Sequence, residues 1–215
     1  MIRTITISQF KDISDETLEL KKITLLMGEN SVGKSTCLQA ILDVLYHSNP
    51  VAKFLLRGHD FSFTTVANKY MNAKEYSISM LDAEGNSALL KVNRDGVVVD
   101  NQTSLELEKN IFYLGANRLG FSEHERVDGE YHVGAQGEYV FGDFHLHKSD
   151  VVSSGLRIVE DSDTLSAHFN YWLSYILGTK FRMDTTDING SEVSVWYEAD
   201  KLSNIAPNQL GVGVS

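Results

Sequence analysis

The chain has 215 residues, of which 42% are hydrophobic, so it can form a packed globular core and is not an intrinsically disordered protein. Its 19 basic and 29 acidic residues give a net charge of −10, which argues against a broad nonspecific nucleic-acid surface but leaves a local basic groove open. The single cysteine, Cys37, excludes an internal disulfide framework, and the apolar runs are too short for a signal peptide or a membrane span, so we expect a cytoplasmic protein.

The first fifty residues predict strands that lead into a loop and a helix. Residues 3–10 alternate polar and apolar side chains and residues 17–20 do so briefly, which predicts the two strands of a hairpin. Residues 22–27 (KITLLM) form an apolar run suited to a buried central strand. After the loop the apolar residues recur at helical spacing, which predicts a helix that ends near residues 47–50.

The middle of the chain favours antiparallel strands. Residues 76–81, 88–92 and 96–99 are apolar or alternating runs separated by turn residues, which predicts a β-meander. Residues 110–114 (NIFYL) predict one more buried strand.

The last third of the chain predicts a loop, a helix and a hairpin. Residues 120–142 are polar and rich in glycine, which is typical of a long functional loop. Residues 164–177 predict an amphipathic helix, whose aromatic side chains we assign to core or interface packing and not to base stacking. Residues 180–183 and 192–197 predict a second hairpin.

A histidine pair in this region has the geometry for a metal ligand set but lacks a clear further ligand. His145 and His147 would share one face of an extended segment, with Asp143 nearby. We therefore interpret them as surface or hydrogen-bonded histidines.

The strongest chemical signal is residues 28–35 (GENSVGKS), which match the phosphate-binding pattern G-x-x-x-x-G-K-[ST] between a predicted strand and a predicted helix. Glycines let backbone N–H groups surround phosphates, the lysine reaches the β- and γ-phosphates, and the Ser35 hydroxyl ligates Mg²⁺. The catalytic candidate is Lys34. The predicted nucleotide-binding residues of this loop are Gly28, Glu29, Asn30, Ser31, Val32, Gly33, Lys34, Ser35 and Thr36.

A phosphate loop alone leaves small-molecule kinases, GTPases and ABC-type ATPases open. The position of the loop in the chain distinguishes these classes, because kinases and GTPases usually begin almost directly with the phosphate-loop strand. Here the preface I-x-I-x-x-F-K-x-I precedes KITLLMGENSVGKST. This arrangement resembles the start of ABC-type ATPases of the RecF, structural-maintenance-of-chromosomes and overcoming-lysogenization-defect group. The resemblance implies an α/β P-loop NTPase fold of ABC type with an antiparallel β subdomain, in which Lys11 approaches the nucleotide phosphates.

Two later segments extend the resemblance. Residues 113–118 (YLGANR) and 133–138 (VGAQGE) resemble a bacterial subgroup of AAA-family ATPases with ABC-type heads, found in retron, toxin and anti-phage loci. They fall where ABC ATPases carry the Q-loop, which senses Mg²⁺ and the γ-phosphate. The resemblance makes Asn117, Arg118 and Gln136 candidate sensor residues, with Arg118 the first to test because a guanidinium suits phosphate.

The end of the sequence is similar to the signature element of the same subgroup. Residues 208–215 (NQLGVGVS) contain G-x-G-x-S, and in such ATPases the serine caps the γ-phosphate bound to the opposite protomer. The resemblance therefore implies that Ser215 contacts ATP in a dimer.

An ABC-type head continues after this serine with a helix and a strand that ends in Asp-Glu. The expected assignment is therefore the N-terminal part of one ATPase domain, lacking the Walker B aspartate and the catalytic glutamate. Its expected segments are residues 1–50 (β preface, phosphate loop and first helix), 51–110 (β-meander), 111–150 (Q-loop-like segment) and 151–215 (helix, hairpin and start of the signature-like element).

The expected function is an ATP-binding head whose Mg-ATP-driven dimerisation or switching controls an effector, in DNA maintenance or anti-phage defence. The implied partners are ATP, an effector protein, and a second copy or a partner chain that supplies the other half of the head; DNA is not indicated by the charge, and no membrane is. Hydrolysis is expected of a complete head. A non-hydrolysing nucleotide-gated interaction module stays open, and a P-loop small-molecule kinase or an ABC transporter subunit fits less well.

Overall fold

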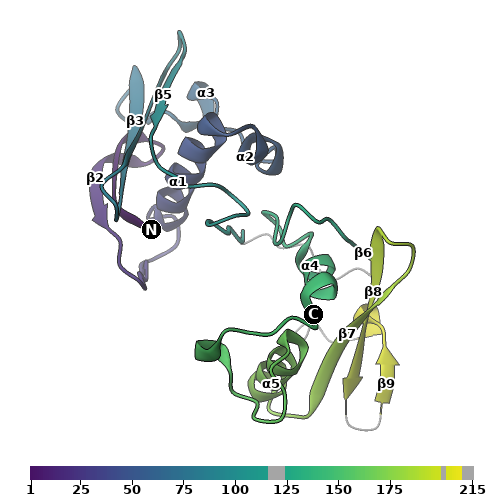
Figure 1. Ribbon diagram of the computed structural model, residues 1–215. Coiled ribbons are helices and arrows are strands. Elements are labelled where there is room, and N and C mark those ends of the chain that lie inside the picture. Colours follow the sequence, from purple (N-terminus) through teal and green to yellow (C-terminus); the bar gives the residue numbers. More distant parts are fainter. Residues whose placement is uncertain (116–123, 200–201, 210–215) are drawn as a thin grey trace. The chain divides into compact units, whose positions relative to one another are not determined.

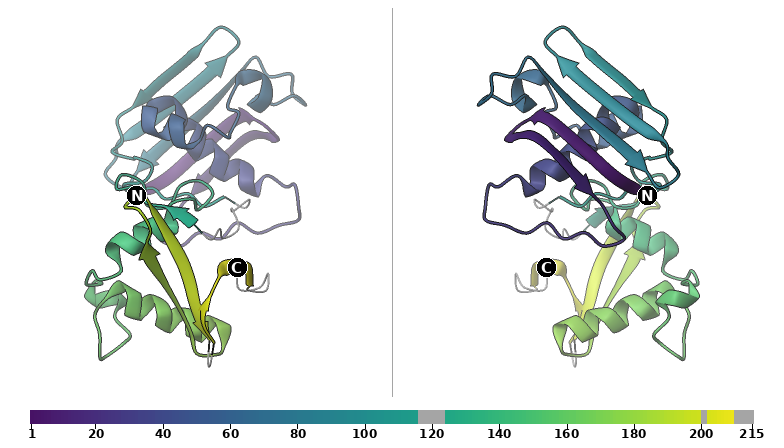
Figure 2. Two further views of the ribbon diagram at one scale, coloured as in Figure 1. Left: turned by 90° about the vertical axis from the view of Figure 1, so that its right-hand side faces the viewer. Right: turned by 90° about the vertical axis from the view of Figure 1, so that its left-hand side faces the viewer.

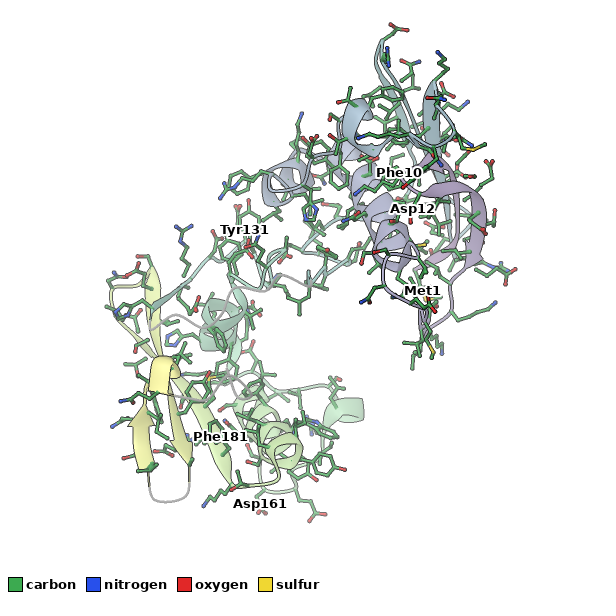
Figure 3. All side chains as sticks on the ribbon, turned by 180° about the vertical axis from the view of Figure 1, so that it is seen from behind. Met1, Phe10, Asp12, Tyr131, Asp161 and Phe181 are labelled. Atoms are coloured by element: carbon green, nitrogen blue, oxygen red, sulfur yellow. The ribbon has the colours of Figure 1, made fainter. Side chains whose placement is uncertain are left out.

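The computed structural model describes residues 1–115, 124–199 and 202–209. They belong to two compact units, Met1–Ile111 and Phe112–Ser215, each built around its own antiparallel sheet (Figure 1). Phe10 lies in the core of the first unit and Phe181 in the core of the second (Figure 3).

The first unit contains a five-stranded sheet in the order β2-β1-β3-β4-β5. Its strands are β1 (Ile2–Phe10), β2 (Ile13–Glu19), β3 (Glu75–Asp82), β4 (Ser87–Asn93) and β5 (Val97–Asn101). The predicted hairpin and the predicted meander are both confirmed. They are joined into one sheet because β1 pairs with β3, with Ile7 opposite Ile78.

The helices of this unit are α1 (Lys34–Ser48), α2 (Pro50–Leu55) and α3 (Phe63–Val66). Helix α1 lies across one face of the sheet (Figure 2). Alternate side chains of the strands are buried on that face, among them Ile5 and Ile7 of β1 and Ile78 and Leu90 of the meander. This period of two is what a sheet with one covered face requires, and it confirms the strand pattern.

The predicted central strand at residues 22–27 is wrong. The segment has no regular secondary structure, and Ile23, Leu25 and Met27 are 90%, 76% and 78% exposed. An apolar strand of this kind is stable only between neighbouring strands that satisfy its backbone and cover both its faces. No described strand pairs with residues 22–27, so the apolar side chains of this run stay exposed.

The predicted strand at residues 110–114 is also wrong. Ile111 makes one isolated bridge to Leu107, and Phe112 and Leu114 are 54% and 48% exposed. A continuous apolar run is therefore not sufficient to form a strand here, because the described residues offer it no partner strand.

The second unit packs two helices on a small sheet. Its strands are β6 (His124–Arg126), β7 (Phe181–Asp187), β8 (Glu192–Ala199) and β9 (Leu202–Ile205); its helices are α4 (Val140–His147) and α5 (Leu165–Leu177), with 3-10 turns at Ser154–Leu156 and Pro207–Gln209. Strand β7 pairs with one edge of β8. Strands β6 and β9 pair with the other edge, β6 near the beginning of β8 and β9 near its end. Phe144, Phe181, Met183, Val195 and Tyr197 form the core.

The predicted second hairpin and helix α5 are confirmed. The Thr164 side chain accepts a hydrogen bond from the Ala167 amide at the start of α5, and Gly178 ends the helix in a left-handed conformation with φ of 68°. The core packing expected of its aromatic residues is confirmed for one of them, and the interface alternative stays a prediction for the exposed ones. Phe169 contacts Phe144 in the core, whereas Trp172 and Tyr175 are 44% and 70% exposed.

The predicted long loop at residues 120–142 is wrong in part, because it contains β6 and the first residues of α4. The helix also overturns the extended geometry expected for the histidine pair. On a helix, residues two apart point in different directions, and His145 hydrogen-bonds through Nδ1 to Thr185 Oγ1 at 2.9 Å.

Among the described residues, no helix combines the length and the apolar character needed to cross a membrane.

Candidate nucleotide-binding site

The phosphate-loop residues form a tight turn at the N-terminus of α1. Gly28 and Gly33 have φ of 149° and 89°, values that a side chain makes unfavourable, and Ser31 has φ of 65°. A Cβ on Gly28 would lie 2.9 Å from Cγ2 of the exposed Val32 side chain, which would have to shift. Gly33 is the N-cap of α1 and offers no side chain to the first N–H groups of the helix. This geometry suits an anion at a helix N-terminus.

Lys34 folds back over this loop. Its Nζ donates hydrogen bonds to the carbonyl oxygens of Gly28 at 2.9 Å and Glu29 at 2.5 Å. The ammonium group is thereby held inside the curve of the loop, where phosphate oxygens would be its alternative acceptors.

The two hydroxyl residues after Lys34 differ sharply in their surroundings. Ser35 is exposed, so its hydroxyl is accessible to a cation or to phosphate. Thr36 is buried, and its Oγ1 donates a hydrogen bond of 2.9 Å to Asp12 Oδ1. The Asp12 carboxylate also borders the loop itself, because a Cβ on Gly33 would lie 3.1 Å from Asp12 Oδ2.

Asp12 is the residue that the sequence interpretation missed. It belongs to the two-residue turn between β1 and β2, and its contact with Thr36 spans 24 positions of the chain. The only available signal was its place beside Lys11 in the F-K-x-I preface.

Lys11 precedes it in the same turn and also contacts α1. Its Nζ donates a hydrogen bond of 2.6 Å to Gln39 Oε1, and its amide donates to the Val66 carbonyl at 2.6 Å. Lys11 has a left-handed φ of 52°, which is unfavourable for a residue with a side chain. The turn thus places a cation on the helix that follows the phosphate loop.

Cys37 lies on the first turn of α1. Burial, and secondly the charge of Asp12, raise the pKa of its thiol, which keeps it protonated. This agrees with a packing role for Cys37.

Three sequence-predicted site residues, Asn117, Arg118 and Ser215, lie outside the described residues, and so do Gly211 and Gly213 of the signature-like element.

The two segments with a Q-loop-like sequence do meet in the second unit. The Gly115 amide donates a hydrogen bond of 2.9 Å to the Ala135 carbonyl, and a Cβ on Gly115 would lie 3.0 Å from that oxygen. Gln136 itself is exposed, and its backbone N–H donates a hydrogen bond of 2.8 Å to Glu138 Oε2. The geometry therefore joins the segments but leaves the Gln136 side chain toward solvent.

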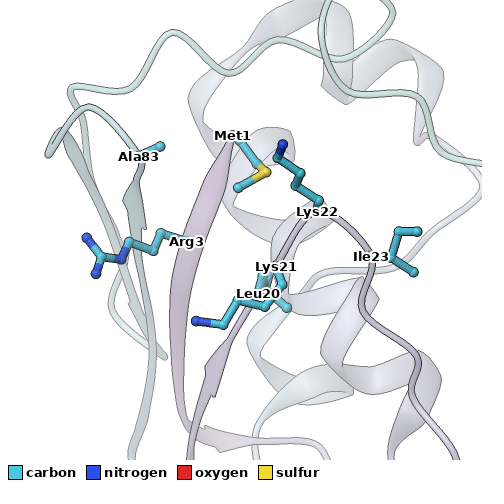
Figure 4. Close-up of a pocket in the computed structure, with 7 residues that line it drawn as sticks. All are labelled: Met1, Arg3, Leu20, Lys21, Lys22, Ile23 and Ala83. Atoms are coloured by element: carbon cyan, nitrogen blue, oxygen red, sulfur yellow. The ribbon is translucent and has the colours of Figure 1, made fainter.

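A pocket of about 600 Å³ lies in the first unit, away from the glycines of the loop, where β1 begins and β2 has just ended (Figure 4). It is lined by Met1, Arg3, Leu20, Lys21, Lys22, Ile23 and Ala83. Lys21 is neutralised by Glu19 at 3.1 Å. Ile23, the first apolar residue of the exposed run at residues 22–27, is one of the lining residues.

A glycine turn before a helix, with a lysine folded into it, defines the first unit as a P-loop nucleotide-binding unit. Residues 1–114 match the family model described as an AAA ATPase domain, and the chain belongs to this family. The expected relationship to ABC-type AAA-family ATPases and the α/β P-loop fold class are thereby confirmed.

A solved structure of the recombination mediator protein RecF with ATP, of the RecFOR pathway, is similar at 18% identity and a TM-score of 0.37, over 48% of this chain and 29% of that chain. The chain thus spans less than a third of that relative's length. The search of curated proteins gave no match.

Proposed function

We propose that the chain is the ATP-binding part of an ABC-type ATPase head, in which Mg-ATP drives dimerisation or switching that controls an effector protein. The observation that carries this proposal is the loop at the start of α1, where two glycines with positive φ curve the backbone around Lys34 Nζ. The family of ATPase domains to which the chain belongs supports ATP as the nucleotide.

The loop residues fit this ligand. The backbone of residues 28–36 would surround the phosphates, and Lys34 would exchange the Gly28 and Glu29 carbonyls for phosphate oxygens. Exposed Ser35 would supply a hydroxyl ligand to Mg²⁺, which in turn neutralises phosphate charge. Lys34 is accordingly the residue we assign to stabilisation of the transferred phosphoryl group.

Lys11 is proposed as a second phosphate-directed cation. Its support is the unfavourable φ of 52°, together with its hydrogen bond to Gln39 on the second turn of α1. If the Lys11 ammonium group released the neutral side-chain amide of Gln39, it could turn toward a bound anion without any change in the strands.

The exposed apolar run supports a partner for this part of the head. Ile23, Leu25 and Met27 would become a central strand if strands from outside the described residues, in a further segment or in a partner chain, paired with them. We propose that these strands carry the Asp-Glu pair needed for hydrolysis. The two units, including the four segments expected from the sequence, would then be parts of one head.

Arg118 and Ser215 are proposed as γ-phosphate contacts, the first from the Q-loop-like segment and the second across a dimer. Both assignments derive from sequence resemblance, as do the roles in anti-phage defence or DNA maintenance.

The proposal is tested by titrating the purified chain with ATP and Mg²⁺ and measuring binding by calorimetry and assembly by light scattering. Lys34→Ala should weaken ATP binding about 100-fold, because a charge-assisted contact with the phosphates is lost. Lys91→Ala, a change at an exposed lysine on β4, should bind ATP like the parent chain. Equal affinity of the Lys34 variant and the parent would overturn the proposal.

Hydrolysis by the purified chain tests whether the site is divided between this chain and a complementary half. We expect the chain by itself to release phosphate slowly, since the residues that position the attacking water belong to the complementary half. Robust turnover by the purified chain that depends on Lys34 would contradict this division of the site.

A further inference from the structure

A cluster of two imidazoles and a carboxylate lies in the second unit. His132, Asp143 and His147 each offer one ligand-type atom, and these atoms lie within 4.8 Å of one another. Nδ1 of His132 is 2.6 Å from Asp143 Oδ1, and Nε2 of His147 is 3.5 Å from the same oxygen. The three side chains are 40%, 27% and 45% exposed, so the centre is partly enclosed and still reachable.

The fold brings these residues together from two segments. Asp143 and His147 are four residues apart on α4 and therefore share one face of that helix. His132 arrives from the segment between β6 and α4, which is fixed by the hydrogen bond from the Tyr139 amide to the Val133 carbonyl at 3.3 Å.

Gly142 permits this approach. A Cβ at that position would overlap the Arg126 carbonyl oxygen and crowd Val127 Cα, so only glycine lets the end of β6 cross α4 there. The chain leaving β6 consequently returns over the helix face that carries Asp143.

His147 is oriented as metal-binding histidines usually are. Its Nδ1 lies 2.7 Å from Asp150 Oδ2, three residues beyond it. A carboxylate that accepts the Nδ1 proton fixes the tautomer, and this leaves the Nε2 lone pair facing Asp143 and the cluster centre. The His132 imidazole also packs edge-on with the Phe112 ring, whose centroid is 6.1 Å away.

We propose that His132, Asp143 and His147 bind a first-row divalent cation of the Zn²⁺ type. Two neutral imidazoles and one carboxylate suit Zn²⁺ and its neighbours, whereas Mg²⁺ and Ca²⁺ prefer oxygen ligands. Bonds of about 2.0–2.1 Å in tetrahedral geometry place ligand atoms roughly 3.3 Å apart. The cluster reaches this spacing if the 2.6 Å separation of His132 Nδ1 and Asp143 Oδ1 opens by about 0.7 Å and ligand atoms up to 4.8 Å apart close by as much as about 1.5 Å.

The set supplies three protein ligands, and the remaining coordination position would be open to water or to a polar group. This site is separate in chemistry from the Mg-ATP site of the first unit, since none of its ligands belongs to the phosphate loop. It stands whether or not the chain binds ATP.

The test is a titration of the chelator-treated chain with Zn²⁺ by calorimetry and with Co²⁺ by visible absorption. We expect one ion per chain, tetrahedral-type Co²⁺ bands, and no displacement by excess Mg²⁺. His132→Gln and His147→Gln should each weaken Zn²⁺ binding at least about 30-fold, and Asp150→Asn about 10-fold through loss of the oriented tautomer.

His145→Gln is the matched control, because His145 lies on the same helix but contacts Thr185 instead of the cluster. Circular dichroism of each variant establishes that it is folded. The site is disproved if the folded His132 and His147 variants retain the parent affinity, or if the His145 variant loses as much affinity as they do. Absence of any Zn²⁺ binding by the parent chain disproves it too.

Discussion

Thr36 Oγ1 donates a hydrogen bond of 2.9 Å to Asp12 Oδ1, and this contact ties the turn between β1 and β2 to the first turn of α1. The other carboxylate oxygen of Asp12 lies beside Gly33. A negative charge therefore stands at the phosphate loop, where it opposes binding of an anion, while it also fixes the hydroxyl of a residue expected to contact that anion. The strand preface contributes directly to the site by this route.

Asp12→Asn should tighten ATP binding. The amide oxygen can still accept the Thr36 hydrogen bond, while the charge that repels phosphate is removed. Because Asp12 is exposed, we expect roughly a 2- to 5-fold gain in affinity at low salt, which shrinks as ionic strength rises. Calorimetry at two salt concentrations measures this, with Asp15→Asn on β2 as the control. Weaker ATP binding by the Asp12 variant would show that the charge is required.

Gly33→Ala should damage the loop in two ways. The φ of 89° becomes strained, and the new Cβ meets Asp12 Oδ2 at 3.1 Å. We expect a loss of about 1–2 kcal/mol in the stability of this unit together with a clear loss of ATP affinity.

Gly85→Ala is the matched control for that strain. Gly85 has φ of 90° but nothing within 4 Å of a Cβ, so its variant should lose similar stability and keep its ATP affinity. Thermal unfolding and an ATP titration on both variants separate the two effects. If the two variants bind ATP equally well, Gly33 has no special role in the loop.

The part of the site that could be predicted from sequence is the part made by local geometry. The glycine spacing and the lysine define the loop, because a single turn of backbone brings residues 28–36 together. The contacts of Asp12 and Lys11 with α1 could not be derived in this way. They depend on how the β1–β2 turn packs against a helix that begins more than twenty residues later.

The fold shows the same division. Strands with a period of two and helix α1 follow from their own patterns, and β1, β3 and β4 agree with them. Residues 22–27 and 110–114 are apolar runs without a period, and whether such a run becomes a strand depends on neighbours that its own sequence does not specify. Helix α4 was missed because its Gly142 and polar residues resemble a loop, while its close packing on β6 requires that glycine.

A buried acidic group in the first unit gives a pH-dependent prediction. Asp43 of α1 is fully buried, accepts a hydrogen bond of 2.8 Å from the Tyr76 hydroxyl, and has His47 Nε2 3.3 Å from its other oxygen without a well-aligned hydrogen bond. Burial raises the pKa of the Asp43 carboxyl, and contacts with His47 and Tyr76 offset only part of this.

Because the folded chain holds the Asp43 proton more tightly than the unfolded chain, this group favours folding below its unfolded pKa. That contribution is lost as the pH rises through the raised pKa of the folded state. Asp43→Asn should therefore gain stability relative to the parent as the pH rises from acidic to neutral. Hydrogen exchange of α1 and β3 at several pH values measures this locally, with Asp100→Asn on β5 as the control. An unchanged pH dependence in the Asp43 variant would contradict the assignment.

Gly142→Ala should destabilise the second unit by about 1–3 kcal/mol, because the added methyl group overlaps the Arg126 carbonyl oxygen and forces β6 away from α4. Gly129→Ala is the control, since a Cβ there has nothing within 4 Å. The two tryptophans of this unit, Trp172 and Trp196, report its unfolding by fluorescence in urea. The Gly142 variant should unfold at lower urea, whereas the Gly129 variant should match the parent.

Displacement of β6 also moves the segment that carries His132, so we expect weaker Zn²⁺ binding by the folded fraction of the Gly142 variant. Parent-like stability would mean that β6 and α4 do not make the close approach described for them.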